Sequence, residues 1–270
     1  MVIDHDLHIH TGLSLCADEN VRVKDYVENA KTMGIKTLGI TNHMWDENIR
    51  PCPLNNNRFY VSQTVKYNLE VKDDLEGLDL GNINILIGAE AEYHPVYGLA
   101  LTEENAEKFD YIIAPNSHTH ITMEKCNYYP YQKHADYMIE AYRKILNSKV
   151  SKHILAMAHP FDAVCCPYNN QILYNLITDD CFKDLFIQTA EKGIAIEINT
   201  ACFPTLKENN IEEFAAMRMF KIAKEMGCKF TFGSDAHAKD QQYDYLRIAY
   251  AIGEYLSLKD ENIVHDYIRK

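Results

Sequence analysis

Histidines and carboxylates stand near both ends of this chain in pairs spaced two residues apart. His8 and His10 lie in residues 6–11 (DLHIHT), and Asp235 and His237 lie in residues 233–237 (GSDAH). Because residues i and i+2 of a strand point to the same side, each pair can face one cavity. Imidazole and carboxylate are ligands for Zn, Mn and Fe. The two pairs therefore predict metal chemistry.

Similar side chains follow the other apolar runs that are typical of strands. Strands are expected at 6–10, 37–41, 83–89, 111–114, 153–158, 194–198 and 229–233. Five of these runs lie between the first and the last. Polar residues stand at the end of each one or just after it: Thr41, Asn42, His43, Glu90, Glu92, His118, His120, His159, Glu197 and Asn199. One ion uses about four ligands, so this surplus indicates two or three ions, with Glu90 able to bridge.

Helical spacing separates these runs and predicts how they are arranged. Helices are expected at 23–33, 61–75, 135–146, 182–192, 211–226 and 243–256, with Gly34, Gly193 and Gly227 as C-terminal caps. Seven strands alternating with helices indicate parallel βα units, either a closed barrel or an open doubly wound sheet. The first strand ends in histidines rather than a Gly-rich phosphate loop, which favours an α/β barrel formed by residues 1–270. In such barrels the functional groups lie at the carboxyl ends of the strands.

Composition narrows the classes of partner. The chain has 270 residues, 47% hydrophobic, and a formal net charge of −12. A surface this acidic repels phosphate backbones, so no nucleic-acid partner is expected. No leader segment or membrane-length apolar run is seen, and the eight cysteines form no Cys-x-x-Cys pair. We therefore expect a cytoplasmic protein with mostly buried, reduced thiols.

The order of these motifs resembles the PHP family, the polymerase and histidinol phosphatase domain. The matching pieces are residues 6–11 (DLHIHT), 40–43 (ITNH), 88–90 (GAE), His118, 158–160 (AHP), 197–199 (EIN) and 233–237 (GSDAH). The resemblance spans essentially the whole chain. It implies a distorted seven-stranded βα barrel with a two- or three-metal centre (Zn, Mn or Fe) that hydrolyses a small phosphate ester. Histidinol phosphate is suggested as substrate by the resemblance alone.

Carried over residue by residue, the resemblance implies three ion sites. The first would use His8, His10, Glu90 and Asp235; the second would use Glu90, His118 and His159; the third would use His43 and His237. Many relatives complete the third site with another histidine, and here Cys16 stands at that spacing, with Asp18 nearby. A thiolate favours zinc, whereas a carboxylate suits Mn or Mg. Cys16 is otherwise a small buried thiol, and His120 remains an alternative to His118.

The expected chemistry is in-line attack on phosphorus by a hydroxide held between the first two ions. The candidate catalytic residues are Glu90, Asp235 and His237. Asn199 and Glu197 would orient ligands, unless Glu197 is only a buried, hydrogen-bonded carboxylate.

Substrate choice should lie in loops 44–59, 119–133 and 160–171. Arg50, Arg58 and Lys125 are candidates to bind a phosphate or a second anionic group, although each is also readable as surface charge.

Three other functions fit part of the pattern. TatD-like hydrolases and amidohydrolases also begin with His-x-His and end with a catalytic aspartate. A nuclease would need to bind a polyanion despite the acidic balance. A metal-stabilised binding domain would keep the ligands and lack turnover. Three features favour PHP over the first group: His237, which follows Asp235 by two positions, the motif at residues 41–43 (TNH), and the motif that contains Glu90.

Overall fold

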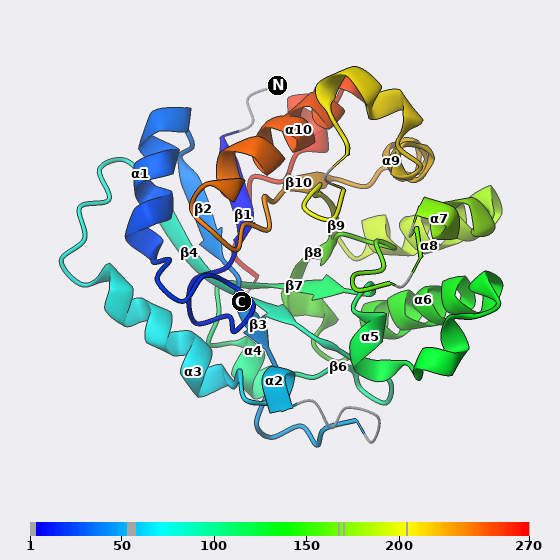
Figure 1. The fold of residues 1–270 in the computed structure, drawn as a ribbon, viewed down its shortest axis with the longest axis horizontal. Coiled ribbons are helices and arrows are strands. Elements are labelled where there is room, and N and C mark those ends of the chain that lie inside the picture. Colours follow the sequence, from blue (N-terminus) through cyan, green and yellow to red (C-terminus); the bar gives the residue numbers. More distant parts are fainter. Residues whose placement is uncertain (1–3, 53–57, 167, 170, 204, 270) are drawn as a thin grey trace.

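The computed structural model describes residues 4–52, 58–166, 168–169, 171–203 and 205–269. Its centre is a parallel sheet in the spatial order β1-β2-β4-β7-β8-β9-β10 (Figure 1). The strands are β1 (His5–Ile9), β2 (Thr37–Ile40), β4 (Asn84–Ala91), β7 (Tyr111–Pro115), β8 (Ile154–Ala158), β9 (Ala195–Ile198) and β10 (Phe230–Phe232). Each overlaps one of the seven expected runs, so the βα-barrel prediction is confirmed.

The sheet closes between its first and last strands without a regular ladder. The His10 N–H donates to the Ala236 carbonyl at 3.0 Å, and the Asp235 N–H donates to the His8 carbonyl at 2.7 Å. Only an isolated bridge, between Ile9 and Ala236, joins the two edges. The result is a distorted barrel in which the two ends of the chain meet.

Three short strands were not expected from the sequence. β3 (His43–Met44) pairs in parallel with the end of β4. β5 (Tyr93–His94) and β6 (Gly98–Leu99) form a separate antiparallel pair. Segments of two residues carry too little periodicity to be recognised from sequence.

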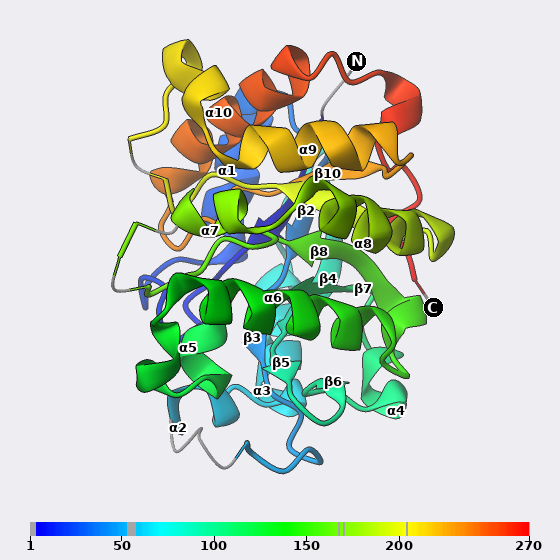
Figure 2. The ribbon, with the colours of Figure 1, turned by 90° about the vertical axis from the view of Figure 1, so that its right-hand side faces the viewer.

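Helices cover the outside of the barrel, and Figure 2 shows α6, α8 and α9 one above another against the strands. The longer helices are α1 (Val23–Met33), α6 (Tyr131–Leu146), α8 (Asp179–Glu191), α9 (Ala216–Glu225) and α10 (Gln241–Tyr255). Shorter ones are α2 (Arg58–Val61), α3 (Val65–Leu69), α4 (Glu103–Ala106), α5 (Thr119–Thr122) and α7 (Gln171–Leu176). The 3₁₀ turns are η1 (Glu70–Leu75), η2 (Lys125–Tyr128), η3 (Ser151–His153), η4 (Glu208–Glu213) and η5 (Asp260–Asn262).

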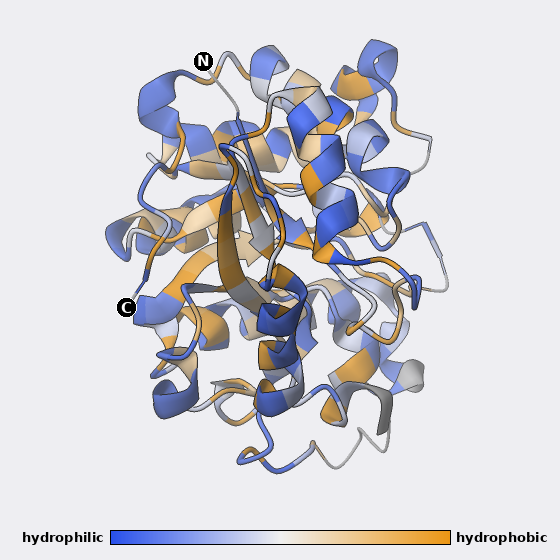
Figure 3. Cartoon of the chain, turned by 90° about the vertical axis from the view of Figure 1, so that its left-hand side faces the viewer, coloured by the Kyte–Doolittle hydropathy of each residue, from blue (hydrophilic) through white to orange (hydrophobic). Residues whose placement is uncertain are grey.

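The helix α1 illustrates why these segments are helical. Val23, Tyr26, Val27 and Ala30 are buried at spacings of three and four residues, which places them on one face. Gly34 ends the helix with φ 76° and donates its N–H to the Ala30 carbonyl. Figure 3 shows the same separation of hydrophobic and polar residues elsewhere in the molecule: the central strands are mainly hydrophobic, and the helices around them are mixed.

Two expected helices are interrupted. The segment 61–75 consists of α3 followed by η1, and the segment 211–226 consists of the end of η4 followed by α9. Between η4 and α9, Phe214 has extended backbone angles, φ −70° and ψ 120°. Phe214 is buried against Phe203, with ring centroids 4.4 Å apart, so tertiary packing overrides the helical pattern there.

Tyr111 fills the interior of the barrel. Tyr111 belongs to β7, and its hydroxyl donates to the Leu7 carbonyl of β1 at 2.8 Å. The side chain therefore crosses from one wall of the barrel to the other. A Cβ on Gly39 would lie 1.8 Å from that hydroxyl, and one on Gly88 would lie 2.8 Å from the ring. The two glycines of β2 and β4 therefore provide the space that Tyr111 occupies.

The C-terminal segment covers the end of the barrel where the strands begin. The Val264 N–H donates to the Phe230 carbonyl at 3.1 Å, and the Arg269 N–H donates to the Asp110 carbonyl at 2.7 Å. This leaves the opposite end, at the carboxyl termini of the strands, as the open face. Across the described ranges no helix is both long enough and apolar enough to cross a membrane.

Candidate metal centre

Side chains from six strands or strand ends meet at the open face. They come from β1 (His8 and, just after it, His10), β3 (His43), β4 (Glu90), and the residues after β7 (His118), β8 (His159) and β10 (Asp235, His237). All are buried except His237, which is partly exposed. They form overlapping groups that could hold an ion: His8/His10/Asp235, His8/Glu90/His159, His43/Glu90/Glu92/His118 and His10/His43/His237.

A β-bulge in β1 aims His8 into this centre. The register of β1 against β2 shifts between Asp6 and Ile9. Leu7 packs inside the barrel with Tyr111, while Ile9 belongs to the cluster beneath the helices. Strict alternation would place Leu7 and Ile9 on the same face and His8 on the opposite one. The bulge turns the strand so that His8 points inward like Leu7, and His10, two residues further, faces the same cavity.

The first group brings the two ends of the chain together. The Nε2 atoms of His8 and His10 lie 3.0 Å apart. Asp235 Oδ1 lies 3.0 Å from His10 Nε2 and 3.4 Å from His8 Nε2. Glu90 Oε2 is 3.6 Å from His8 Nε2. These four residues are the set expected for the first ion.

The second group is built around the other oxygen of Glu90. His159 Nε2 lies 2.9 Å from Glu90 Oε1, and His118 Nε2 lies 3.7 Å from the same atom. Because Oε1 faces this pair while Oε2 faces His8 and His43, Glu90 is placed to bridge two ions. His120 lies outside these groups, and its Nε2 contacts the Tyr60 hydroxyl at 2.6 Å.

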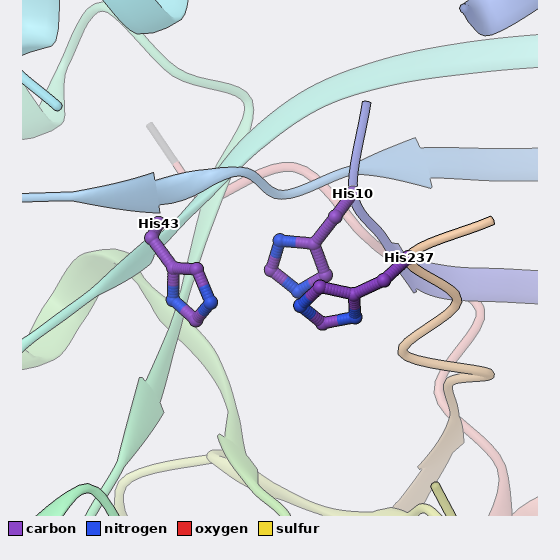
Figure 4. Close-up of side chains that lie close together, drawn as sticks. All are labelled: His10, His43 and His237. Atoms are coloured by element: carbon purple, nitrogen blue, oxygen red, sulfur yellow. The ribbon is translucent and has the colours of Figure 1, made fainter. Parts of the chain in front are cut away.

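The third group gathers three imidazoles from three parts of the chain (Figure 4). The rings of His10 and His237 stack with centroids 4.2 Å apart, and His43 lies 5.9 Å from His237. Cys16 lines one cavity with His237 and His43, but its thiol belongs to none of the four groups. The two histidines lower the pKa of the Cys16 thiol to about 6, although burial acts in the opposite direction.

Asp18 is exposed, and its Oδ1 accepts the Asn20 N–H at 2.9 Å, so it lies outside the groups. The residue Cys16 is exposed as well, although its thiol is partly enclosed where it lines the cavity, so the alternative of a small buried thiol is wrong. More generally, Cys52 and Cys228 are buried, whereas Cys165 is exposed.

Hydrogen bonds from a surrounding layer orient the ligands. Glu197 Oε1 contacts His8 Nδ1 at 2.8 Å, while its Oε2 accepts the His159 N–H at 2.8 Å. The Ser117 hydroxyl contacts His159 Nδ1 at 2.6 Å, and the Ser14 hydroxyl contacts His10 Nδ1 at 3.0 Å. In each case the partner holds one ring nitrogen and leaves the other facing the centre.

Backbone strain is concentrated at the same place. Asp235 has φ 54° and His159 has φ 27°, values that side chains larger than glycine rarely adopt. Such strain persists where the surrounding structure imposes it, and it is common at functional sites.

The carboxylates are held in their charged forms. Burial would raise the pKa of Glu90 and of Asp235, but the facing histidines lower both well below the usual value. Burial would likewise lower the pKa of His8 and of His159, but Glu197 and Glu90 respectively lead the groups that raise them. The pKa of His159 rises to about 9, and that of His8 lies well above its usual value. In the metal-free protein, protonated imidazoles therefore balance the acids.

Unpartnered atoms indicate that cations fit this centre. His43 Nδ1, Glu90 Oε2 and Glu92 Oε1 are buried and have no hydrogen-bond partner. Yet His43 Nδ1 lies 2.7 Å from Glu90 Oε2 and 3.0 Å from Glu92 Oε1. Leaving such atoms unsatisfied costs about 1–3 kcal/mol each, which a bound cation would offset. The donor set, nitrogens and carboxylate oxygens, is one that Zn, Mn or Fe accepts.

A cavity of about 300 Å³ opens onto the centre. Its lining combines the centre's residues with uncharged ones: Cys16, His43, Tyr60, His118, Val164, Cys165, Ala201, Cys202, Asp235, His237, Gln241 and Tyr245. Arg50 is exposed and is not part of this lining. The side chains of Arg58 and Lys125 lie outside the described part of the structure.

Glu92 was not among the predicted ligands, although it belongs to one of the four groups. The signal for it was present in the sequence, because Glu90 and Glu92 share the two-residue spacing of His8 and His10. Strand prediction ended this run at residue 89, whereas β4 continues to Ala91 and carries Glu92 into the centre.

Comparisons with known proteins agree with this architecture. Residues 6–201 match the PHP domain. The crystal structure of histidinol phosphate phosphatase from Lactococcus lactis, complexed with Zn, L-histidinol and phosphate, is similar with a TM-score of 0.69 at 15% identity, covering 96% of this chain and 95% of that one. A histidinol phosphatase structure from Listeria monocytogenes, itself assigned only provisionally, gives 0.63 at 14% identity over 88% and 96%. No curated protein sequence matches significantly.

At 14–15% identity these two structures show that the fold is similar, and nothing more. The family match covers most of the chain and includes every motif from His8 to Glu197. The chain belongs to the PHP domain family.

Proposed function

We propose that this protein is a metal-dependent phosphoesterase that hydrolyses a small-molecule phosphate monoester. The observation that carries the proposal is the gathering of buried histidines and carboxylates, some without hydrogen-bond partners, beside a cavity at the carboxyl ends of the strands. Membership of the PHP family supports the same chemistry.

The ligands would divide into three sets. His8, His10, Glu90 and Asp235 would hold one ion, and Glu90, His118 and His159 would hold a second. Cys16, His43 and His237 would hold a third. Divalent ions bound there would activate water as a nucleophile and neutralise charge on the phosphoryl oxygens.

Asp235 and His237 would act closest to the substrate, and Glu90 would act behind them. Asp235 and His237 line the cavity, so they can contact a substrate as well as an ion. The backbone carbonyl of Asp235 lies 2.8 Å from His237 Nδ1, which leaves His237 Nε2 free to face the ligand. Glu90 is fully buried between the groups and would keep them in a fixed arrangement. Asp235 would orient the attacking water from the cavity side.

The cavity favours a small substrate. Its volume is about 300 Å³, and beyond the metal centre its wall is made of Tyr60, Tyr245, Val164, Ala201 and other uncharged side chains. Histidinol phosphate is the first compound to assay, because the similar Lactococcus lactis structure contains L-histidinol and phosphate. A role for Arg50, Arg58 or Lys125 in binding an anion, and a cytoplasmic location, remain predictions from the sequence.

A reconstitution assay tests the proposal. Metal-free protein would be loaded with Zn, Mn or Fe and assayed for phosphate release from p-nitrophenyl phosphate, histidinol phosphate and a panel of phosphometabolites. Amide, lactone and single-stranded DNA substrates would be included. We expect phosphate release only with metal.

The matched variants are His10→Ala in the centre and His265→Ala on the surface. His265 lies 3.5 Å from Asp260 and is not part of the metal centre. His10→Ala should lose at least about 100-fold in activity while remaining folded, since it removes a metal ligand. His265→Ala should match the wild type. Turnover that survives metal removal, or a preference for amides or DNA, would contradict the proposal.

A further inference from the structure

Glu92 occupies an anchored and enclosed position just after β4. Its N–H donates to the Met44 carbonyl at 3.2 Å, and its own carbonyl accepts the Ala100 N–H at 2.8 Å. The residue has no exposed surface, and it is not among the described residues that line the cavity. It therefore cannot touch a substrate there.

The carboxylate of Glu92 lies behind two histidines. Its Oε2 is 2.8 Å from His118 Nδ1, and its Oε1 is 3.0 Å from His43 Nδ1. The opposite edge of the His118 ring faces Glu90, with Nε2 3.7 Å from Oε1. His43 in turn lines the cavity with Cys16 and His237.

The two histidines share one group with Glu90 and Glu92, and His43 also belongs to the group with His10 and His237. In the ion sets of the proposed function, His118 serves the second ion and His43 the third. We propose that Glu92 is a positioning residue that serves two metal sites at once and so couples the filling of the second and third ions.

The physical reason lies in the tautomer of each ring. A carboxylate that accepts a proton from one imidazole nitrogen fixes the ring and makes the other nitrogen a better ligand. In the metal-free protein both carboxylates face His43 Nδ1, with Glu90 Oε2 at 2.7 Å and Glu92 Oε1 at 3.0 Å, and neither forms a hydrogen bond with it, so Glu90 is a competitor of Glu92 there. An ion held by Glu90 would remove this competitor, leaving Glu92 as the partner of His43. Filling one site thereby prepares the other.

The chain contains a comparison for this role. Glu197 contacts His8 Nδ1 at 2.8 Å, and His8 belongs to the first ion set. Among the described residues, Glu197 also accepts hydrogen bonds from the His159 N–H and the Asn199 side chain, rather than from a second imidazole. Glu197 should therefore act mainly on the first ion, and Glu92 on the other two.

A binding titration tests the inference. Metal-free wild type, Glu92→Gln, Glu197→Gln and the exposed control Glu104→Gln would be titrated with Zn²⁺ in competition with a chromophoric chelator. Bound metal would be counted by mass spectrometry. Circular dichroism of each metal-free protein would establish folding. Should Glu92→Gln fail to fold, Glu92→Asp replaces it, because its charge is kept and its reach is too short for both rings.

We expect the wild type to bind three ions and Glu92→Gln to bind two of them about 10–100-fold more weakly, since orienting carboxylates contribute on that order. Glu197→Gln should weaken mainly one ion, and Glu104→Gln none. The inference is overturned by a wild type that holds fewer than three ions, by unchanged affinities in Glu92→Gln, or by weakening of a single ion. It rests on the metal sites of the proposed function, but the readout needs no phosphate ester, so failure of the phosphatase assay would leave it standing.

Discussion

At the scale of single residues, Cys16 is where this chain departs from the resemblance that identified the third site. It lines the cavity with His43 and His237, and these two histidines lower the pKa of its thiol. Asp18, the alternative, faces Asn20 instead. A thiolate is a soft ligand, so a site built with Cys16 should prefer zinc over manganese.

We predict that Cys16→Ser weakens one bound zinc by at least about 10-fold, because a hydroxyl replaces a thiolate donor. With Co²⁺ in place of zinc, the wild type should show a sulfur-to-cobalt charge-transfer band that the variant lacks. Cys165→Ser is the matched control, being an exposed thiol of the same cavity wall. A cobalt spectrum that does not change on Cys16→Ser would exclude the thiol as a ligand.

At the scale of elements, the strands position the site through features that periodicity does not reveal. The bulge in β1 turns His8 inward, and the two-residue strand β3 places His43 beside Glu90. Tyr111 spans the interior beneath the centre and depends on the absence of a side chain at Gly39. Small changes in these elements should therefore reach the metal ligands.

We predict that Gly39→Ala lowers the free energy of unfolding by about 1–3 kcal/mol, the usual cost of overpacking, because the new methyl group meets the Tyr111 hydroxyl. Tyr111→Phe alone loses one hydrogen bond, at about 1 kcal/mol. The double variant should be less unstable than the sum of the two, since the clashing oxygen is gone. Urea unfolding of all four proteins measures the coupling, and strict additivity would show that the two residues do not meet.

At the scale of the whole molecule, we expect both metal binding and proton binding to change stability. A ligand that binds only the folded state adds about 2.7 kcal/mol when its concentration is 100 times its dissociation constant. The centre joins both ends of the chain through Asp235 and the pair of His8 and His10. Its ions should therefore stabilise the barrel closure as well as supply chemistry.

We predict that removing the metal with a chelator lowers the melting temperature, and that adding Zn²⁺ restores it. Asp235→Asn should show a smaller shift, because one ligand of the first ion is lost. Scanning calorimetry with and without chelator measures this difference. Equal melting temperatures in both conditions would mean that the ions do not bind the folded state preferentially.

Acid should destabilise the metal-free protein through buried histidines away from the centre. Burial lowers the pKa of His5 to about 4, below the unfolded value of 6.5. The unfolded chain therefore binds more protons between these values, and stability present above pH 6.5 is lost as pH falls towards 4.

The His5 contribution should be about 3 kcal/mol, from about 1.36 kcal/mol for each pKa unit. His5→Gln, which keeps an acceptor for the Phe232 N–H, should flatten this pH dependence in denaturant titrations. His265→Gln should change it much less, because the charge of His265 is a smaller cause of the low pKa of His5 than burial is. An unaltered slope in His5→Gln would assign the acid sensitivity to other groups.

The sequence by itself determined the seven strands, the barrel and most of the residues that gather at the candidate metal centre. Apolar runs and helical spacing are local properties, and parallel strands bring their carboxyl ends to one face whatever the loops do. Side chains such as His159 and Asp235 could therefore be assigned to one site from their positions after a strand. The same rule extends to Glu92 once β4 is followed to its true end.

Only the tertiary structure decided which neighbours meet. It placed His118 in the centre and His120 against Tyr60, and it set Cys16 beside His43 and His237 while Asp18 faced solvent. Which residues meet depends on a bulge, on loop conformation and on which ring nitrogen of a histidine a carboxylate from another segment contacts. Such features arise from contacts between segments far apart in the chain, and a periodicity of two or 3.6 residues carries no information about them.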